Sequence, residues 1–137
     1  MKIAVVDGQG GGMGKIIVEK LKKTFDEEIY IIALGTNSLA TSIMLKAGAN
    51  AGATGENAIV YNASKVDLII GSIVIIISNS LRGELTAKMA GAISDSNALK
   101  ILIPLNQNHI EVAGCSNKPL PHYVDDVIYS VNQQLRR

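Results

Sequence analysis

The sequence predicts a single α/β domain over residues 1–137, with a doubly wound, mostly parallel sheet between two layers of helices. Residues 3–6 form a continuous apolar run, as is typical of strands buried on both faces. A glycine-rich turn follows, and residues 14–25 then carry apolar side chains at helical spacing. Residues 29–34 form a second apolar run, so the chain opens with a strand–helix–strand unit whose strands are parallel.

The rest of the chain continues this alternation. A helix is expected to begin at residues 36–38 and end at Gly48, and a small-residue loop over 49–55 follows it. Next come a helix over 56–64 capped by Thr54 and a strand over 67–71. The last expected elements are a helix after Gly83, strands over 100–103 and 109–113, and a helix from Pro121. Pro104 and a polar turn at 106–108 join the last two strands. Residues 73–77 fit either a strand or a buried helix capped by Ser72. This order of elements is Rossmann-like.

Composition excludes several classes of partner. The 13 basic and 12 acidic side chains leave no charge excess that would bind nucleic acid or an anionic membrane, and one Phe without Trp disfavours base stacking. Cys115 is the single cysteine, which excludes a disulfide framework and a cysteine-based metal site within one chain. We expect no metal. Neither a signal peptide nor a membrane-spanning apolar run is visible, so we expect a cytoplasmic protein.

Residues 7–15 read Asp-Gly-Gln-Gly-Gly-Gly-Met-Gly-Lys between the first strand and the first helix. Helix N-termini bind anions, and glycine lets a phosphate approach the backbone. The G-x-G-x-x-G pattern fails because Met13 occupies its third glycine, and the Walker A pattern fails because Ile16 follows Lys15. The spacing that fits is G-x-x-x-G-x-G. We expect a phosphate or nucleotide to bind the loop that consists of Gly8, Gln9, Gly10, Gly11, Gly12, Met13 and Gly14.

This loop resembles the cofactor loop of short-chain dehydrogenases, which read Thr-Gly-x-x-x-Gly-x-Gly, although Asp7 replaces the threonine. The resemblance implies NAD or NADP. Tyr61 and Lys65, in Tyr-Asn-Ala-Ser-Lys, also match the catalytic Tyr-x-x-x-Lys of that family. Gly48 stands where the family has its serine, however, and Lys65 precedes a strand, about 17–20 Å from the glycine loop at the other edge of the sheet. We therefore expect Tyr61 and Lys65 to be structural.

Other side chains near the loop allow more than one role. Thr36, Asn37 and Ser38 follow the second strand, where they either contact a ribose or 2′-phosphate or cap the next helix. Ser72 follows the third predicted strand and is expected at the cofactor site. Asp7 would repel a phosphate unless it held a metal ion or accepted hydrogen bonds from loop amides, and we favour the second role.

Acid/base chemistry has few candidates in this sequence. Glu56 and Glu84 are the carboxylates considered for it, and both are expected to be acids in the first turn of a helix. His109, His122 and Cys115 have no partner at a spacing that would indicate a site. The catalytic residues, if there are any, remain unknown from the sequence.

Four segments together resemble a family of short bacterial proteins of unknown function: residues 7–15, 33–37, 52–58 and 100–104. That resemblance implies a Rossmann-like fold and no activity. We expect a nucleotide-binding protein with NAD or NADP as the first candidate and a mononucleotide or phosphorylated metabolite as the second. The alternative is a non-enzymatic sensor, regulatory or scaffold module without a dinucleotide. A homo-oligomer is among the assemblies expected.

Overall fold

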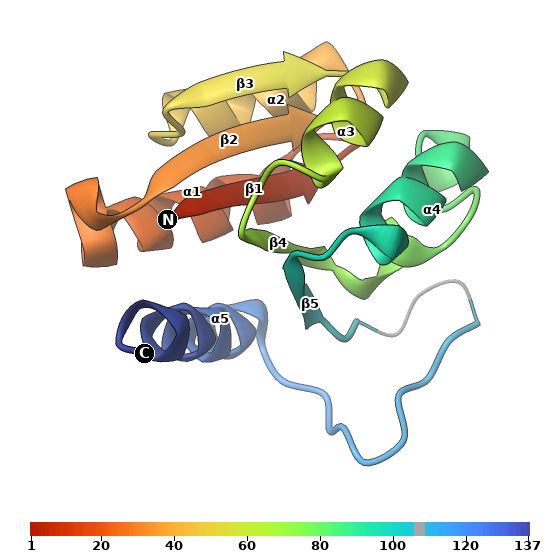
Figure 1. The fold of residues 1–137 in the computed structure, drawn as a ribbon. Coiled ribbons are helices and arrows are strands. Elements are labelled where there is room, and N and C mark those ends of the chain that lie inside the picture. The colour runs from red at the N-terminus through yellow and green to blue at the C-terminus, as the bar shows by residue number, and fades with distance from the viewer. Residues whose placement is uncertain (106–108) are drawn as a thin grey trace.

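Five parallel strands form one sheet in the computed structural model, which describes residues 1–105 and 109–137 (Figure 1). The strands are β1 (Lys2–Asp7), β2 (Tyr30–Gly35), β3 (Ala51–Thr54), β4 (Leu68–Ser72) and β5 (Leu99–Ile103). Their order across the sheet is β3-β2-β1-β4-β5, and every neighbouring pair is parallel. The doubly wound α/β fold predicted from the sequence is confirmed.

Helices cover both faces of the sheet (Figure 1). One layer contains α1 (Gly12–Phe25), α2 (Ser38–Lys46) and α5 (Leu120–Leu135), and the other contains α3 (Glu56–Ala63) and α4 (Ala87–Asp95). Short 3-10 helices η1 (Asp26–Glu28), η2 (Ile73–Ile76) and η3 (Leu81–Gly83) lie in the connections. No helix within the described residues is long and apolar enough to cross a membrane.

Strand β1 shows why the central strands of the sheet are continuous apolar runs in the sequence. Ile3 and Val5 belong to the core cluster under α1, α2 and α5, whereas Ala4 and Val6 belong to the cluster under α3 and α4. Because successive side chains of a strand point to opposite faces, a central strand between two helical layers is apolar at every position. The four side chains are 0–2% exposed.

The predicted loop over 49–55 is wrong, because β3 forms there as an edge strand beside β2. Helix α2 lies close against this strand: a Cβ at Gly52 would lie 2.8 Å from Cγ2 of Thr41 and 2.9 Å from Cδ1 of Leu45. The small residues of β3 therefore permit close packing. The expected cap Thr54 bonds to the Thr41 hydroxyl instead, at 2.7 Å, and Gly55 is the N-cap of α3.

The structure distinguishes between the strand and the buried helix that the sequence allowed for residues 73–77. Residues 73–76 form the buried 3-10 helix η2, capped by Ser72, and not a strand. The helix expected after Gly83 begins later, at Ala87, where the Thr86 side chain accepts a hydrogen bond from the Met89 amide at 3.2 Å.

The strand predicted over 109–113 is also wrong. Residues 109–119 run away from the sheet and return to it where α5 begins (Figure 1). A strand needs a neighbouring strand for its backbone hydrogen bonds, and within the described residues no strand pairs with this segment. The turn predicted at 106–108 lies outside the described residues. Strand β5 is consequently an edge of the sheet.

Candidate functional site

The glycine loop lies at the point where the strand order of the sheet reverses. Strands β1 and β4 are neighbours, and the chain leaves their carboxyl ends toward opposite faces of the sheet. Ligands of open α/β sheets bind in the crevice at this position. A cavity of about 170 Å³ occupies it, lined by Asp7, Gly8, Gln9, Gly10, Gly11, Gly12, Met13, Ser72, Val74 and Leu81.

Helix α1 begins at this cavity with part of its first turn unpaired. Its N-cap, Gly11, has a φ of 73°, a left-handed conformation that favours glycine. The Gly14 amide donates to Asp7 and the Lys15 amide donates to the Gly11 carbonyl. No described residue accepts a hydrogen bond from the amides of Gly10, Gly12 or Met13. Three donors at a helix N-terminus thus remain available to a ligand.

Asp7 fixes the shape of the loop. One carboxylate oxygen accepts from the Gly8 amide at 2.8 Å, and the other accepts from the Gly14 amide at 2.6 Å. Burial raises the pKa of Asp7 above its ordinary value of 3.8, the two amides oppose this effect, and the negative charge of Glu84 adds to it. The amide-binding role expected for Asp7 is therefore present in the structure.

Glu84 anchors the other side of the loop from the segment before α4. Its Oε1 atom accepts from the Gln9 amide at 2.8 Å, from the Thr36 hydroxyl at 2.6 Å and from the Asn37 side-chain amide at 2.8 Å. The Thr36 hydrogen bond, followed by that of Gln9, lowers the pKa of Glu84 below its ordinary value. The expectation that Glu84 is a first-turn helix acid is wrong, because α4 begins three residues later, at Ala87. No local sequence signal indicates its role.

Thr36 and Asn37 are engaged within the protein, and Ser38 lies apart from the loop. Asn37 caps α2, since its Oδ1 accepts from the Ala40 amide at 2.9 Å, and its Nδ2 donates to the Gln9 carbonyl at 2.9 Å as well as to Glu84. Ser38 is exposed in the first turn of α2. The structure shows the predicted helix capping for Asn37, and it adds a role that was not predicted, the attachment of Thr36 and Asn37 to Glu84.

Ser72 brings a hydroxyl to the opposite wall of the cavity. It ends β4, is 8% exposed, and accepts a hydrogen bond from the Val74 amide at 3.3 Å. None of the described residues accepts a hydrogen bond from the Ser72 hydroxyl. Its proton is therefore available to a ligand that lies between Ser72 and the glycine loop.

Tyr61 and Lys65 lie near the amino ends of the strands, opposite the glycine loop, as their position in the sequence indicates. The Asp67 amide, two residues after Lys65, donates to the carbonyl of Lys2 at the start of β1. Tyr61 is 59% exposed, and the Lys65 ammonium lies 4.0 Å from the centre of its ring. Neither residue lines the cavity at the glycine loop.

The cavity presents backbone amides and a serine hydroxyl as hydrogen-bond donors. No lysine or arginine is among the residues that line the cavity, and Lys15 is exposed and pairs with Glu19 at 3.9 Å. Both Asp7 oxygens already serve as acceptors, as does Oε1 of Glu84. No group of three His, Cys, Asp or Glu side chains suited to a metal occurs in the described part of the chain. The volume is below the 300–1,000 Å³ of typical ligand pockets and suits one phosphate-sized group.

Comparison with known proteins gives a family without an assigned activity. A family model described as a domain of unknown function, DUF3842, matches residues 2–136. No curated protein matches the chain. A solved structure of a dodecameric FMN-dependent UbiX-like decarboxylase from Escherichia coli O157:H7 has 13% identity and a TM-score of 0.45, over 96% of this chain and 95% of that one. At this identity, the likeness carries no information on function.

Proposed function

The chain belongs to the DUF3842 family, whose function is unknown, and we propose that it binds the phosphate of a small phosphorylated ligand at residues 8–14. The observation that carries this proposal is a set of three amides, those of Gly10, Gly12 and Met13, around a cavity at the start of α1. None of them has an acceptor among residues 1–105 and 109–137. A phosphate supplies the acceptors that these donors lack.

The two carboxylates support the proposal by organising the loop before a ligand arrives. Asp7 and Glu84 together hold the amides of Gly8, Gln9 and Gly14, which leaves the amides between them oriented but unused. A loop already fixed in its binding conformation loses less conformational entropy when the ligand binds. The Ser72 hydroxyl supplies a further donor from β4.

A mononucleotide or phosphorylated metabolite fits this site better than the NAD or NADP favoured by the sequence. A dinucleotide of the Rossmann type places a ribose at the end of the second strand. There the Thr36 hydroxyl and the Asn37 amide group already donate to Glu84. NAD or NADP therefore remains the second candidate, one whose ribose would compete with Glu84.

We assign binding and no reaction. The Asp7 carboxylate at the cavity is committed to loop amides, so a catalytic acid or base would have to come from another chain or from the ligand itself. A sensor or regulatory module needs binding alone, and the site meets that requirement. A scaffold without a ligand would have no use for the unpaired amides.

Thermal unfolding with matched pairs of ligands tests the phosphate site. The pairs are FMN with riboflavin and AMP with adenosine, and NAD, NADP and inorganic phosphate complete the series. A ligand at about a hundred times its Kd stabilises the folded state by about 2.7 kcal/mol. We expect at least one phosphorylated member to raise the Tm more than its dephosphorylated partner does.

The Gly12→Val variant provides the control. A Cβ at Gly12 meets no atom within 4 Å, and Gly12 lines the cavity, so valine should fit the fold and add bulk beside the unpaired amides. The variant should unfold cooperatively and lose the ligand-induced shift. Equal shifts for both members of each pair, or shifts that survive in Gly12→Val, would contradict the proposal, as would no shift with any ligand.

A further inference from the structure

Strand β5 lies at an edge of the sheet, and no strand within the described residues pairs with its outer side. The Leu99 amide donates to the Asp67 carbonyl at 3.1 Å, so Leu99 faces β4. Because successive residues of a strand direct their backbone groups to opposite sides, the N–H and C=O of Lys100 and Leu102 point to the free edge. No described residue pairs with these groups. An edge of this kind is a template for another strand.

The usual protection of an edge strand is missing here. Edge strands are often blunted by a lysine that extends into solvent across the edge. The side chain of Lys100 is instead folded back, with its ammonium donating to the Ser94 carbonyl at 3.1 Å and to the Ser96 carbonyl. The edge of β5 is therefore accessible.

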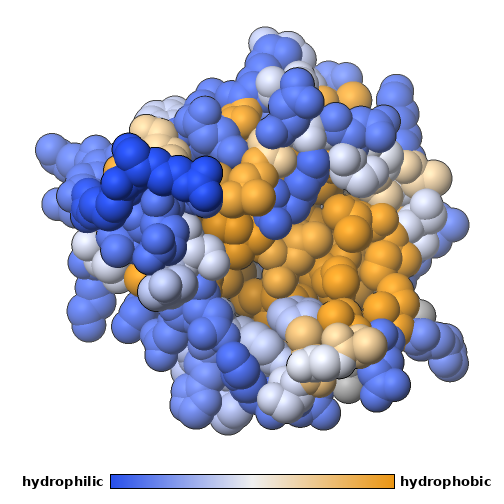
Figure 2. Space-filling view, turned by 60° about the horizontal axis from the view of Figure 1, so that its bottom comes forward, coloured by the Kyte–Doolittle hydropathy of each residue, from blue (hydrophilic) through white to orange (hydrophobic). Residues whose placement is uncertain are grey.

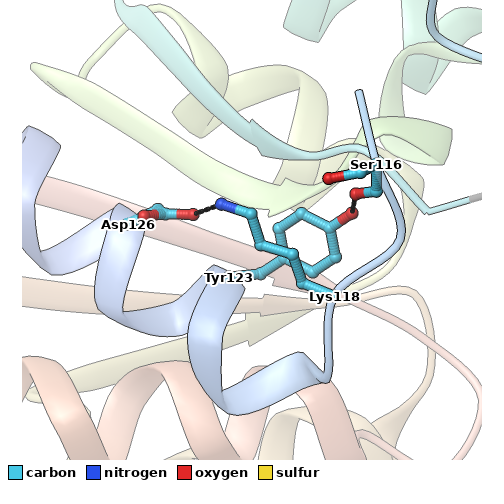
Figure 3. A network of polar contacts seen from close by, with 4 residues as sticks. All are labelled: Ser116, Lys118, Tyr123 and Asp126. Atoms are coloured by element: carbon cyan, nitrogen blue, oxygen red, sulfur yellow. Dashed lines mark hydrogen bonds and ion pairs between the residues drawn. The ribbon is translucent and has the colours of Figure 1, made fainter. Parts of the chain in front are cut away.

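An apolar hollow of about 330 Å³ lies between this edge and α5. Figure 2 shows apolar side chains gathered in a hollow on the side of the molecule that is lowest in Figure 1. The apolar residues that line the cavity are Ile101, Leu102, Ile103, Pro104, Tyr123 and Val127. Its two charged residues, Lys118 and Asp126, are paired at 2.6 Å (Figure 3). The hollow thus offers a mainly apolar surface, whose two charges form an ion pair with each other.

Residues 109–113, His-Ile-Glu-Val-Ala, have the pattern of a strand that lacks a sheet. Ile110 and Val112 are half-buried and alternate with exposed His109, Glu111 and Ala113. This period of two is what a strand with one apolar face shows. Neither Ile110 nor Val112 belongs to either core cluster.

In the structure this segment does not pair with β5 of its own chain. The Tyr123 hydroxyl donates to the Ser116 carbonyl at 2.8 Å, which holds Ser116 at the first turn of α5 (Figure 3). Ser116 also lines the hollow, together with Ile101, Leu102 and Ile103 of β5. The chain that follows residues 109–113 is thus held between β5 and α5, while residues 109–113 themselves lie off the sheet.

We infer that two copies of this chain associate by exchanging residues 109–113, which add as a strand to the edge of β5 in the partner copy. The exchange pairs the outward backbone groups of Lys100 and Leu102 and places Ile110 and Val112 in the apolar hollow. A two-fold axis makes the exchange reciprocal, so each dimer gains two added strands.

Light scattering with size exclusion and hydrogen exchange on the full chain test this inference. We expect a mass at least twice the 14.5 kDa of one chain. We also expect slow exchange for the amides of Lys100 and Leu102 and across 109–113, with protection lost at both sites together on dilution. The double variant Ile110→Lys with Val112→Lys should raise the dimer Kd at least about a hundredfold, because it places charges against an apolar surface.

Glu111→Lys is the matched control, since it changes the charge of the opposite face of the same segment and should leave the dimer intact. A monomer at all concentrations would overturn the inference. So would a dimer that persists in the double variant, or one that protects Leu102 while residues 109–113 exchange freely. If the double variant does not fold, the unmodified chain still tests the inference. On dilution, residues 109–113 and the amides of Lys100 and Leu102 should lose their slow hydrogen exchange together.

Discussion

The carboxylate of Glu84 accepts a hydrogen bond from the Gln9 amide at 2.8 Å, although the two residues lie 75 positions apart in the chain. The same oxygen accepts from Thr36 and Asn37, so one atom joins the loop after β1, the end of β2 and the segment before α4. The conformation of the glycine loop therefore depends on a residue far from it in sequence.

Replacing Glu84 with glutamine should lower the free energy of unfolding by about 1–2 kcal/mol. Glutamine retains one acceptor oxygen but loses the charge that strengthens three hydrogen bonds. Urea unfolding measures the difference. Glu27→Gln is the control, because Glu27 is an exposed residue of η1 and its change should stay within about 0.5 kcal/mol. Equal effects of the two substitutions would show that Glu84 does not anchor the loop.

The stabilisation by Glu84 should depend on pH in one direction. Hydrogen bonds from Thr36 and Gln9 lower its pKa in the folded state below the ordinary value of 4.5. Its contribution is therefore complete above that value and is lost as the pH falls through the lowered pKa. Urea unfolding of the unmodified chain and of Glu84→Gln over this acid range should converge. A difference that stays constant or grows on acidification would contradict the hydrogen-bonded carboxylate.

Much of the fold was predictable because the central strands are buried on both faces. Residues 3–6 and 29–34 are continuous apolar runs, and the structure places β1 and β2 there. Strand β3 escaped prediction because Ala51–Thr54 contains only small residues, whose role is to let α2 pack closely. Residues 109–113 have a strand pattern, but such a pattern does not say whether a neighbouring strand is available.

Only those parts of the site that are formed by residues close together in the sequence were predictable. The glycine spacing indicated the loop, and the position of Asp7 before it indicated an acceptor for loop amides. Glu84 could not be assigned, because its contacts with Gln9, Thr36 and Asn37 span 75, 48 and 47 residues and leave no periodic signal. Tertiary contacts of that span also supply the partners of Thr36 and Asn37 within the protein.

Two glycines of the same loop should respond in opposite ways to alanine. A Cβ at Gly14 would lie 2.5 Å from the sulfur of buried Met44 and 3.0 Å from Oδ2 of Asp7, so Gly14→Ala should destabilise the fold by about 1–2 kcal/mol. At Gly12 the added methyl meets no atom within 4 Å, so Gly12→Ala should leave stability unchanged or raise it by up to about 1 kcal/mol. Thermal unfolding compares them, and a destabilised Gly12→Ala would contradict the open cavity wall.

Ser72→Ala should weaken the binding of inorganic sulfate about two- to tenfold, because the variant lacks the hydroxyl donor at the cavity. Ser80 supplies a matched control, because it is also a buried serine and lies outside the cavity lining. Its hydroxyl donates a hydrogen bond to the carbonyl of Val74 at 2.6 Å. Ser80→Ala should lower stability without changing the sulfate Kd. Isothermal titration measures the affinities, and equal losses in both variants would show that Ser72 acts only through the fold.

Acidification from neutral pH should strengthen sulfate binding. Burial raises the folded-state pKa of Asp7, so its carboxylate gains a proton earlier than an exposed aspartate and stops repelling the anion. Sulfate keeps its charge over this range, whereas the charge of inorganic phosphate would change. Asp7→Asn removes the titration of Asp7, so its sulfate Kd should vary less with pH than that of the unmodified chain. Titration calorimetry at a series of pH values measures both. A flat profile in the unmodified chain, or an unchanged slope in Asp7→Asn, would show that Asp7 does not face the anion.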